Sequence, residues 1–427
     1  MITPSTIGIP QADLDDLKAR LAQVRWTHEL SGVGTDYGVD LASLKRLVTY
    51  WQQGYDWRIW EAKLNAYPQF TTTIDGATIH FLHVRSNVAD ALPLILTHGW
   101  PTSVFDYLQL IDPLIDPSSH GGKKTQAFHL VIPSLPGFGF SGPTTEPGWD
   151  RYRIARAWAE LMRRLGYDRY GVHGTDWGSM ISPEVGRCDP EHVLGVHVTE
   201  IFSFPSGDPA EIAALSSQEK EQWQTFQEWV EKKGAYATLQ STVPQTLAHA
   251  LADSPVGQLA WNYQMYGDDE SDDYILTNVM IYWLTNTAAS SARLYYENAH
   301  AKYVPTEPTT IPLGLCNFAD IYQSIRLFAE RDHKNIVSCV NACVILRRNN
   351  FDPLLIFSPR MTTYRVLRSV CSATRANQRC ALHLRKVRLH LDILWWTAGA
   401  ETSEREVYRR AFHARSSRLP SLPQASR

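Results

Sequence analysis

The spacing of apolar residues divides the chain into helical and strand-forming stretches. Between Ala12 and Val24 apolar side chains recur every three or four residues, which predicts a helix with one buried face. The stretch from Leu41 to Leu64 is dense in Trp and Tyr. We expect this aromatic stripe to pack on a core or on another domain rather than to contact a ligand. This pattern therefore predicts that residues 1–70 form a helical arm.

After the arm, the pattern changes to short runs that predict β-strands. Phe70–Ile74 and Ala77–Val84 flank Asp75-Gly76, which is a turn signal for a hairpin. Helical spacing returns over residues 150–166. Strands that alternate with helices predict a parallel sheet of the α/β class. Further apolar runs, each typical of a fully buried strand, are Leu92–Thr97, Phe128–Pro133, Tyr170–His173 and Val193–Val198.

A second helical block follows the predicted sheet. Residues 206–303 are mainly helical with Trp and Tyr throughout, which suggests a lid inserted into an α/β core. Residues 304–338 return to loop, short strand and helix. The expected segments are a helical arm (1–70), a first core part (71–205), a helical cap (206–303), a second core part (304–338) and an atypical basic C-terminal segment (339–427).

Composition marks the last segment as different. The chain has 427 residues and a formal net charge of −3, so no overall basic excess favours nucleic acid or an anionic membrane. From Val337 onward the net charge is +11, whereas the preceding residues carry −14. The same tail holds four of the six cysteines and one of the 25 glycines, Gly399. Six cysteines in so long a chain do not make a disulfide scaffold.

The remaining global features favour a soluble, cytoplasmic protein. No run of about 18 apolar residues could span a bilayer. Residues 1–7 lack the basic start and apolar stretch of a signal peptide. No metal-ligand cluster or phosphate-binding glycine loop occurs, so we expect neither a metal nor a cofactor. The sequence is compatible with a homodimer as well as with a monomer.

The first chemical motif is Gly174-x-Asp176-x-Gly178, which follows a predicted strand and precedes a helix-compatible run. This is the layout of a nucleophile elbow, with aspartate where most such enzymes have serine. The glycines keep the turn tight, because side chains there would collide with the neighbouring strand and helix. Alone, the motif is equally compatible with an ordinary turn in which Asp176 caps a helix.

A second motif favours the catalytic interpretation. His98-Gly99-Trp100-Pro101 ends a buried strand about 75 residues upstream, where this fold builds half of its oxyanion hole. The backbone N–H groups of Trp100 and Trp177 would then point at one developing oxyanion. An aspartate carboxylate is ionised at neutral pH and can attack saturated carbon without a base. Hydrolysis of the resulting ester needs a general base, normally a histidine oriented by another carboxylate.

At these motifs the chain resembles the microsomal-type epoxide hydrolase family, over about residues 5–337. The resemblance implies an α/β-hydrolase fold with a helical N-terminal arm and an inserted helical cap. It also implies hydrolysis of a small apolar epoxide to a vicinal diol through an aspartyl ester. Besides the elbow, the tracts that carry it are Ile9-Pro-Gln-Ala-Asp-Leu-Asp-Asp-Leu, His80-Phe-Leu-His-Val, His98-Gly-Trp-Pro, Pro133-Ser-Leu-Pro-Gly-Phe-Gly-Phe-Ser141, Asp253-Ser-Pro-Val-Gly257, Tyr282-Trp-Leu-Thr-Asn-Thr and Arg293-Leu-Tyr-Tyr-Glu-Asn298.

Roles for individual residues follow from the resemblance. It implies that Asp176 is the nucleophile and that Tyr295 and Tyr236 hydrogen-bond the epoxide oxygen. A phenol is a weak acid suited to stabilising or protonating an alkoxide. Tyr296 points elsewhere if its segment is helical. Asp320 would orient the catalytic histidine.

The chain departs from the family after about residue 338. The family continues with a Gly-Gly-His loop that carries the general base, but no Gly-His pair follows the elbow here. We hypothesise that the tail does not encode the family's ending, as from a retained intron, a frame error or a diverged paralogue; a basic functional tail is the alternative. Ester hydrolysis is then expected to be slow. The histidines after Asp320, none in such a loop, are His333, His383, His390 and His413.

Two other functions stay open. Haloalkane dehalogenation uses the same elbow with Trp-type halide donors, and the tyrosine pair argues against it. The chain could instead be a catalytically inactive member or binding protein of the same fold.

Overall fold

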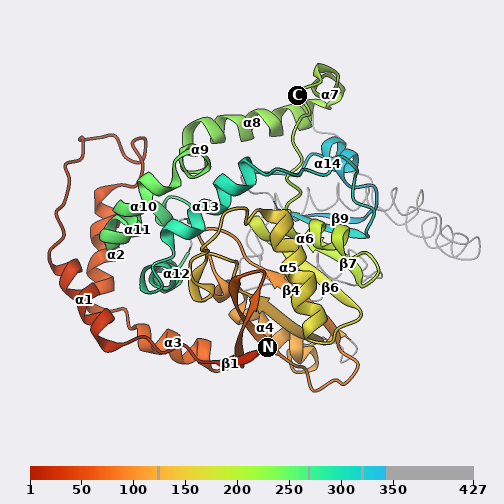
Figure 1. The fold of residues 1–427 in the computed structure, drawn as a ribbon. Coiled ribbons are helices and arrows are strands. Elements are labelled where there is room, and N and C mark those ends of the chain that lie inside the picture. The colour runs from red at the N-terminus through yellow and green to blue at the C-terminus, as the bar shows by residue number, and fades with distance from the viewer. Residues whose placement is uncertain (123–125, 268–269, 319–321, 343–427) are drawn as a thin grey trace, which may run out of the picture. The chain divides into compact units, whose positions relative to one another are not determined.

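The computed structural model describes residues 1–122, 126–267, 270–318 and 322–342, all within one compact unit (Figure 1). The strands of this part of the chain form a nine-stranded sheet in the order β1-β2-β3-β5-β4-β6-β7-β8-β9. The strands are β1 (Thr3–Ser5), β2 (Gln69–Ile74), β3 (Ala77–Val84), β4 (Leu92–Thr97), β5 (Phe128–Pro133), β6 (Tyr170–Gly174), β7 (Val193–Val198), β8 (Leu313–Phe318) and β9 (Ile336–Ala342).

The sheet changes direction at β5. The pairs among β1, β2, β3 and β5 are antiparallel, and every pair from β5 to β9 is parallel. In the hairpin between β2 and β3, Asp75 and Gly76 both have positive φ, 48° and 81°. This is the tight turn that the Asp-Gly dipeptide predicts. The parallel strands and the helices between them confirm the α/β class.

Helices lie before, between and after these strands. The α-helices are α1 (Gln11–Ala22), α2 (Leu41–Gln53), α3 (Trp57–Asn65), α4 (Leu108–Ile115), α5 (Arg151–Arg164), α6 (Trp177–Cys188), α7 (Pro209–Ala214), α8 (Ser217–Lys233), α9 (Ala235–Thr242), α10 (Pro244–Asp253), α11 (Pro255–Tyr263), α12 (Asp272–Leu284), α13 (Ala288–Ala299) and α14 (Arg326–Asp332). Along the sequence, helices α7 to α13 all come between β7 and β8, two strands that are neighbours in the sheet. We propose residues 206–303 as the limits of this helical insertion.

Each face of the sheet carries its own apolar core, because successive side chains of a strand point to opposite faces. On β4, Ile95 belongs to the core that α5 and α6 cover. Its neighbours Leu94 and Leu96 belong to the core on the side of α4. All three are fully buried, and this explains why the strand reads as a continuous apolar run.

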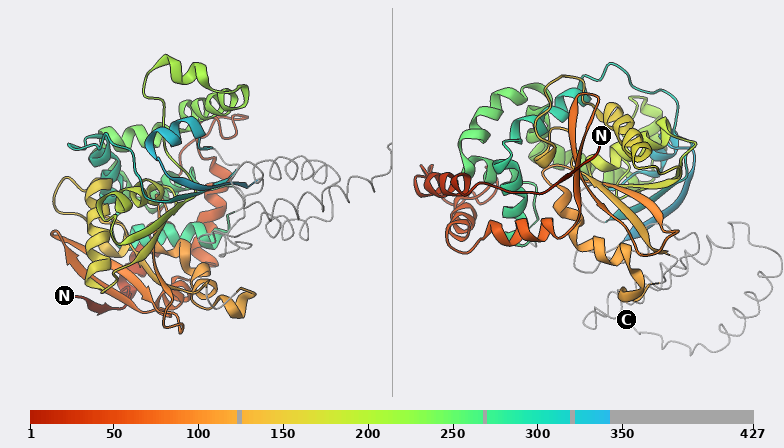
Figure 2. Two further views of the ribbon diagram at one scale, coloured as in Figure 1. Left: turned by 90° about the vertical axis from the view of Figure 1, so that its right-hand side faces the viewer. Right: turned by 60° about the horizontal axis from the view of Figure 1, so that its bottom comes forward.

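Helices α1, α2 and α3 of the arm contact α11 and α12 of the insertion (Figures 1 and 2). The indole Nε1 of Trp51 on α2 donates to the sulfur of Met280 on α12 at 3.2 Å. The hydroxyl of Tyr50 donates to Asp273 at 2.8 Å. The aromatic stripe therefore packs on another part of the chain, as the sequence predicts.

The prediction that residues 1–70 are helical is partly wrong. Residues 41–64 are helical as expected and form two helices, since Gly54 ends α2 and the Asp56 side chain caps α3 by accepting from the N–H of Arg58. Thr3–Ser5 is an edge strand that pairs with β2. Among the described residues, no helix is both long and apolar enough to cross a membrane.

Candidate active site

The elbow predicted from the glycine motif lies between β6 and α6. Asp176 precedes the helix with φ 52° and ψ −119°, a backbone conformation that residues other than glycine rarely adopt. A Cβ atom at Gly174 would overlap the carbonyl of Gly178, and one at Gly178 would overlap the carbonyl of Thr97. Only glycine at both positions allows strand, turn and helix to approach this closely, and this holds the Asp176 side chain at the end of the sheet.

The oxyanion loop meets the elbow because β4 and β6 are parallel neighbours. Thr97 is paired with Gly174 at the ends of the two strands, so Gly99 and Trp100 emerge beside Asp176. The backbone N–H of Trp100 donates to Oδ1 of Asp176 at 2.8 Å. The backbone N–H of Trp177 acts on the same carboxylate and lowers its pKa. The structure thus brings Trp100 and Trp177, the two residues predicted to form an oxyanion hole, close to the carboxyl group of Asp176.

Two tyrosines from the insertion lie against these tryptophans. The ring of Tyr236 on α9 stacks on Trp100, with centroids 5.2 Å apart and planes within 7°. Tyr295 on α13 meets Trp177 edge to face at 4.8 Å and lies 6.0 Å from the ring of Tyr236. Both phenols interact electrostatically with the carboxylate of Asp176. The two tyrosines singled out by motif position therefore lie over the elbow.

The loop after β5 holds α13 in place. The hydroxyl of Ser290 donates to the carbonyl of Gly137 at 2.5 Å, and the N–H of Gly139 donates to Thr287 Oγ1 at 3.0 Å. These bonds fix the first turn of α13 to the core, and Tyr295 follows two turns later. Tyr296 is 37% exposed and stacks on His300 at 4.0 Å. It points away from the elbow, as expected of a helix.

Burial raises the pKa values of the carboxyl and phenol groups at the site. It raises the pKa of Asp176 to about 7, although the N–H groups of Trp100 and Trp177 act in the opposite direction. Burial and the nearby Asp176 charge raise the pKa of Tyr236 above its ordinary value. Burial, Tyr236 and Asp176 raise the pKa of Tyr295 as well. Both phenols keep their protons and can donate to a bound oxygen.

The orienting acid and three of the four candidate bases cannot be placed at this site. Asp320, His383, His390 and His413 lie outside the described residues. His333 is described and follows the end of α14, where its Nδ1 lies 2.7 Å from Thr309 Oγ1. Burial lowers the pKa of His333 to about 4. Among the described residues, no histidine hydrogen-bonds to Asp176.

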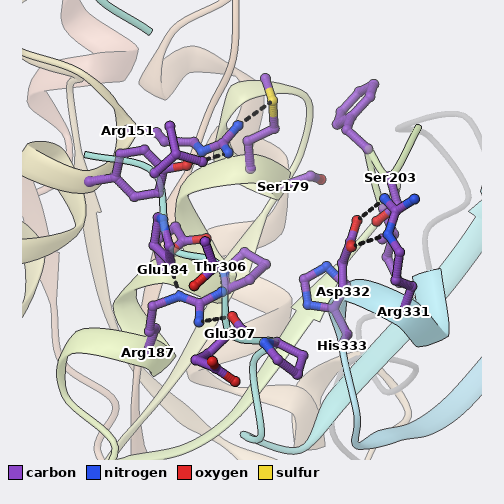
Figure 3. A pocket seen from close by; sticks show the side chains of 18 residues that line it. Arg151, Ser179, Glu184, Arg187, Ser203, Thr306, Glu307, Arg331, Asp332 and His333 are labelled. Carbon is purple, nitrogen blue, oxygen red and sulfur yellow. Dashed lines mark hydrogen bonds and ion pairs between the residues drawn. The ribbon is translucent and has the colours of Figure 1, made fainter. Parts of the chain in front are cut away.

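His333 instead lines a cavity of about 330 Å³ beside α6 (Figure 3). Arg151, Glu184 and Arg187 line one side of it, and Asp332 lies next to His333 on the other. The lining includes none of the residues predicted as nucleophile, phenol or oxyanion donor, which are Asp176, Tyr236, Tyr295, Trp100 and Trp177. Cavity and elbow are therefore separate features. Within the described chain, no three His, Cys, Asp or Glu side chains are placed to hold a metal ion.

Sequence reasoning missed one carboxylate at the elbow. Oε2 of Glu200, two residues after β7, lies 3.2 Å from the backbone N of Asp176 and 3.0 Å from Ser179 Oγ. A signal was present, because a polar residue just after a strand that is the parallel neighbour of β6 lies at the same edge of the sheet.

Comparisons with known proteins agree with this geometry. The family profile described as epoxide hydrolase N terminus matches residues 2–107, and the profile described as alpha/beta hydrolase fold matches residues 93–284. A candidate epoxide hydrolase of Stigmatella aurantiaca is 43% identical over 347 residues, 79% of this chain and 78% of that protein. Epoxide hydrolase 1 of Sus scrofa is 32% identical, covering 70% and 72%. The structure of Aspergillus niger epoxide hydrolase superposes with a TM-score of 0.69 at 30% identity, over 80% of this chain and 90% of that one.

Proposed function

The chain belongs to the epoxide hydrolase family and has the α/β-hydrolase fold, and on this premise we propose that it opens an apolar epoxide by forming an ester on Asp176. The observation that carries the proposal is the hydrogen bond of 2.8 Å from the Trp100 N–H to the carboxylate of Asp176, with the buried Tyr295 and the half-buried Tyr236 of the insertion beside it.

The first step needs only groups of the elbow and the insertion. A carboxylate oxygen of Asp176 attacks one carbon of the epoxide, and the bond from that carbon to the ring oxygen breaks. The electron pair stays on the oxygen, which takes a proton from Tyr295 or Tyr236 as it leaves. The products are an alkyl ester of Asp176, a hydroxyl on the adjacent carbon and a tyrosinate.

The two phenols make this step possible at neutral pH. An alkoxide is a poor leaving group, so a donor must reach the oxygen as the bond breaks. The raised pKa values keep both phenols protonated before the substrate binds. The aromatic rings of Trp100, Trp177, Tyr236 and Tyr295 pack on one another, and they favour an apolar substituent on the epoxide.

The second step is the hydrolysis of the ester. Water attacks the carbonyl carbon of Asp176, the N–H groups of Trp100 and Trp177 stabilise the oxyanion, and the diol leaves. This step needs a general base, and the sequence after the elbow contains no Gly-His loop to carry one. We propose that ester hydrolysis is much slower than ring opening, so the alkylated protein accumulates.

Intact-mass measurement tests both steps. The full-length protein is incubated with styrene oxide and sampled over time, while the diol is quantified in the same samples. The expected result is a single covalent adduct on the peptide containing Asp176, with diol appearing slowly. Asp176→Asn is the matched control and should form no adduct.

The two other functions predict different outcomes. Fast diol formation without an adduct would show that a base acts on the ester after all. Chloride release from a haloalkane would favour dehalogenation. A ligand-induced rise in Tm without any adduct would indicate a binding protein that has lost the chemistry.

A further inference from the structure

A second carboxylate joins three parts of the elbow. Besides the contacts to Asp176 and Ser179, Oε2 of Glu200 accepts a hydrogen bond from Thr199 Oγ1 at 2.5 Å. Asp176 is the turn residue, Ser179 lies in the first turn of α6, and Thr199 follows β7. One oxygen atom therefore connects the nucleophile, the helix behind it and the neighbouring strand.

These contacts meet a need that the strained turn creates. A residue other than glycine at positive φ costs about 1–3 kcal/mol and persists only where its surroundings hold it. The N–H of Asp176 precedes α6, so it is not part of the helical hydrogen-bond ladder; it donates to Glu200 instead. The Ser179 hydroxyl lies between Gly174 O at 2.9 Å and Glu200 Oε2 at 3.0 Å. Glu200 thus supports the backbone on which the nucleophile stands.

We infer that Glu200 is a positioning residue of the reaction, which holds the elbow through its hydrogen bonds and keeps a negative charge beside the nucleophile. The kinetic part of this inference rests on the proposed function, since it concerns the same carboxyl group. Glu200 does not touch the substrate in this proposal. It acts through Asp176, on both its geometry and its ionisation.

The charge effect depends on every group that faces Asp176. Burial is the largest cause that raises the pKa of Asp176. The charges of Glu200, in the loop after β7, and of Asp106, in the 3-10 turn Val104–Tyr107, raise it further. The N–H groups of Trp100 and Trp177 lower it. The phenols of Tyr236, Tyr295 and Tyr282, from α9, α13 and α12, are neutral. On its other side, Glu200 raises the pKa of Cys316 on β8.

Direct titration of Asp176 separates charge from geometry. The full chain is labelled with [4-¹³C]aspartate, and the Asp176 signal is identified by its loss in Asp176→Asn. In Glu200→Gln the amide oxygen can still accept hydrogen bonds, but the charge is gone. The midpoint of Asp176 should fall by roughly half a pH unit or more. An unchanged midpoint would overturn the charge part of the inference.

Alkylation rates test the positioning part. With styrene oxide, the high-pH plateau rate should stay within about threefold of the parent in Glu200→Gln and fall roughly 10–100-fold in Glu200→Ala, which has no acceptor. Glu184→Gln is the matched control: Glu184 is a buried carboxylate on α6 that pairs with Arg187 at 2.8 Å, and it should change neither rate nor midpoint. An unchanged plateau in Glu200→Ala would refute positioning. If that variant does not fold, Ser179→Ala tests the same point, because it removes the hydrogen bond from the Ser179 hydroxyl to Glu200; an unchanged plateau in Ser179→Ala would then refute positioning.

The two proposals fail separately. If the parent protein forms no adduct, the proposed function is wrong, but the titration of Asp176 in the parent and in Glu200→Gln still decides the effect of Glu200. If the parent forms the adduct and neither Glu200 variant differs from it, only the inference on Glu200 is wrong.

Discussion

The backbone N–H of Trp100 donates to Oδ1 of Asp176, although 76 residues separate them in the chain. The pairing of β4 with β6 creates this contact, since both residues follow strands that end side by side. The same N–H that binds the free carboxylate can bind the oxyanion formed when water attacks the ester. The donor is in place before the reaction begins.

Gly99 controls how closely the two loops approach. A Cβ atom at this position would overlap the carboxyl group of Asp176. We expect Gly99→Ala to displace the carboxylate from Trp100 and to lower the alkylation rate by roughly 100-fold, whereas overpacking lowers stability by only about 1–3 kcal/mol. Stopped-flow or timed intact-mass measurements give the rate, and thermal melting gives the stability. Gly8→Ala is the control, because nothing lies within 4 Å of a Cβ there.

The phenols should affect ring opening unequally. Tyr295 is 8% exposed and contacts both tryptophans, whereas Tyr236 is half-buried and stacks on Trp100. Each substitution to Phe removes one donor, and we expect the alkylation rate to fall roughly 100-fold or more, in line with the usual contribution of a general acid, with the larger fall in Tyr295→Phe. The double variant should form almost no adduct.

Tyr296→Phe is the matched control for the phenols. It removes a hydroxyl from the same helix at a ring that stacks on His300, outside the aromatic cluster. Its alkylation rate should equal that of the parent protein. A rate for Tyr295→Phe close to that of Tyr296→Phe would refute the role of Tyr295.

The pKa of Asp176 predicts how alkylation depends on pH. Only the ionised carboxylate attacks, so the rate should rise with pH, reach half its maximum near pH 7 and level off above about pH 8. Because this pKa is raised from 3.8 to about 7 in the folded state, the ionisation of Asp176 reduces stability as the pH rises from about 4 to about 7, and the loss is complete above that range. Asp176→Asn should therefore melt at a higher temperature than the parent at pH 8, and this difference in Tm should be smaller at pH 5. A rate that is already maximal at pH 5 would contradict this.

The geometry of the elbow could be predicted from the sequence because its requirements are local. Gly174 and Gly178 are needed where strand, turn and helix crowd within five residues, and the short apolar run before them locates the strand. Tyr236 and Tyr295 could not be predicted from local pattern. Only their place in motifs of a known family separated them from the other tyrosines.

Glu200 was missed although it follows a predicted strand, because its contacts with the elbow depend on two distant pairings. Its carboxylate reaches the elbow only since β7 lies beside β6 and since Ser179 faces that edge. The three-residue strand β1 was missed for a similar reason: Thr3–Ser5 is too short for a pattern and becomes a strand only by pairing with β2. Non-local contacts limit the prediction in both cases.

Buried histidines predict a loss of stability in mild acid. Burial lowers the pKa of each below the ordinary value of 6.5. As the pH falls below about 6.5, these side chains become protonated in the unfolded chain but not yet in the folded protein, so unfolding becomes more favourable. The raised pKa of Asp176 has the opposite effect, since it makes unfolding less favourable as the pH falls, but this is one group against six histidines. Five of the six are buried, and the sixth, His333, is half-buried; the buried ones are His80, His83, His98, His173 and His197.

We expect Tm to fall steadily between pH 7 and pH 4.5, and His333 offers a way to attribute part of that fall. The pKa of His333 is lowered to about 4, and its ring hydrogen-bonds Thr309, a contact that the amide of Gln can replace. Between pH 6.5 and pH 4, His333 takes up a proton when the protein unfolds, and Gln at this position cannot. The Tm of His333→Gln should therefore fall less steeply with decreasing pH than that of the parent. His249→Gln replaces an exposed histidine and should keep the parent slope. Equal slopes in both variants would show that the pKa of His333 is not lowered in the folded protein, and would refute this attribution.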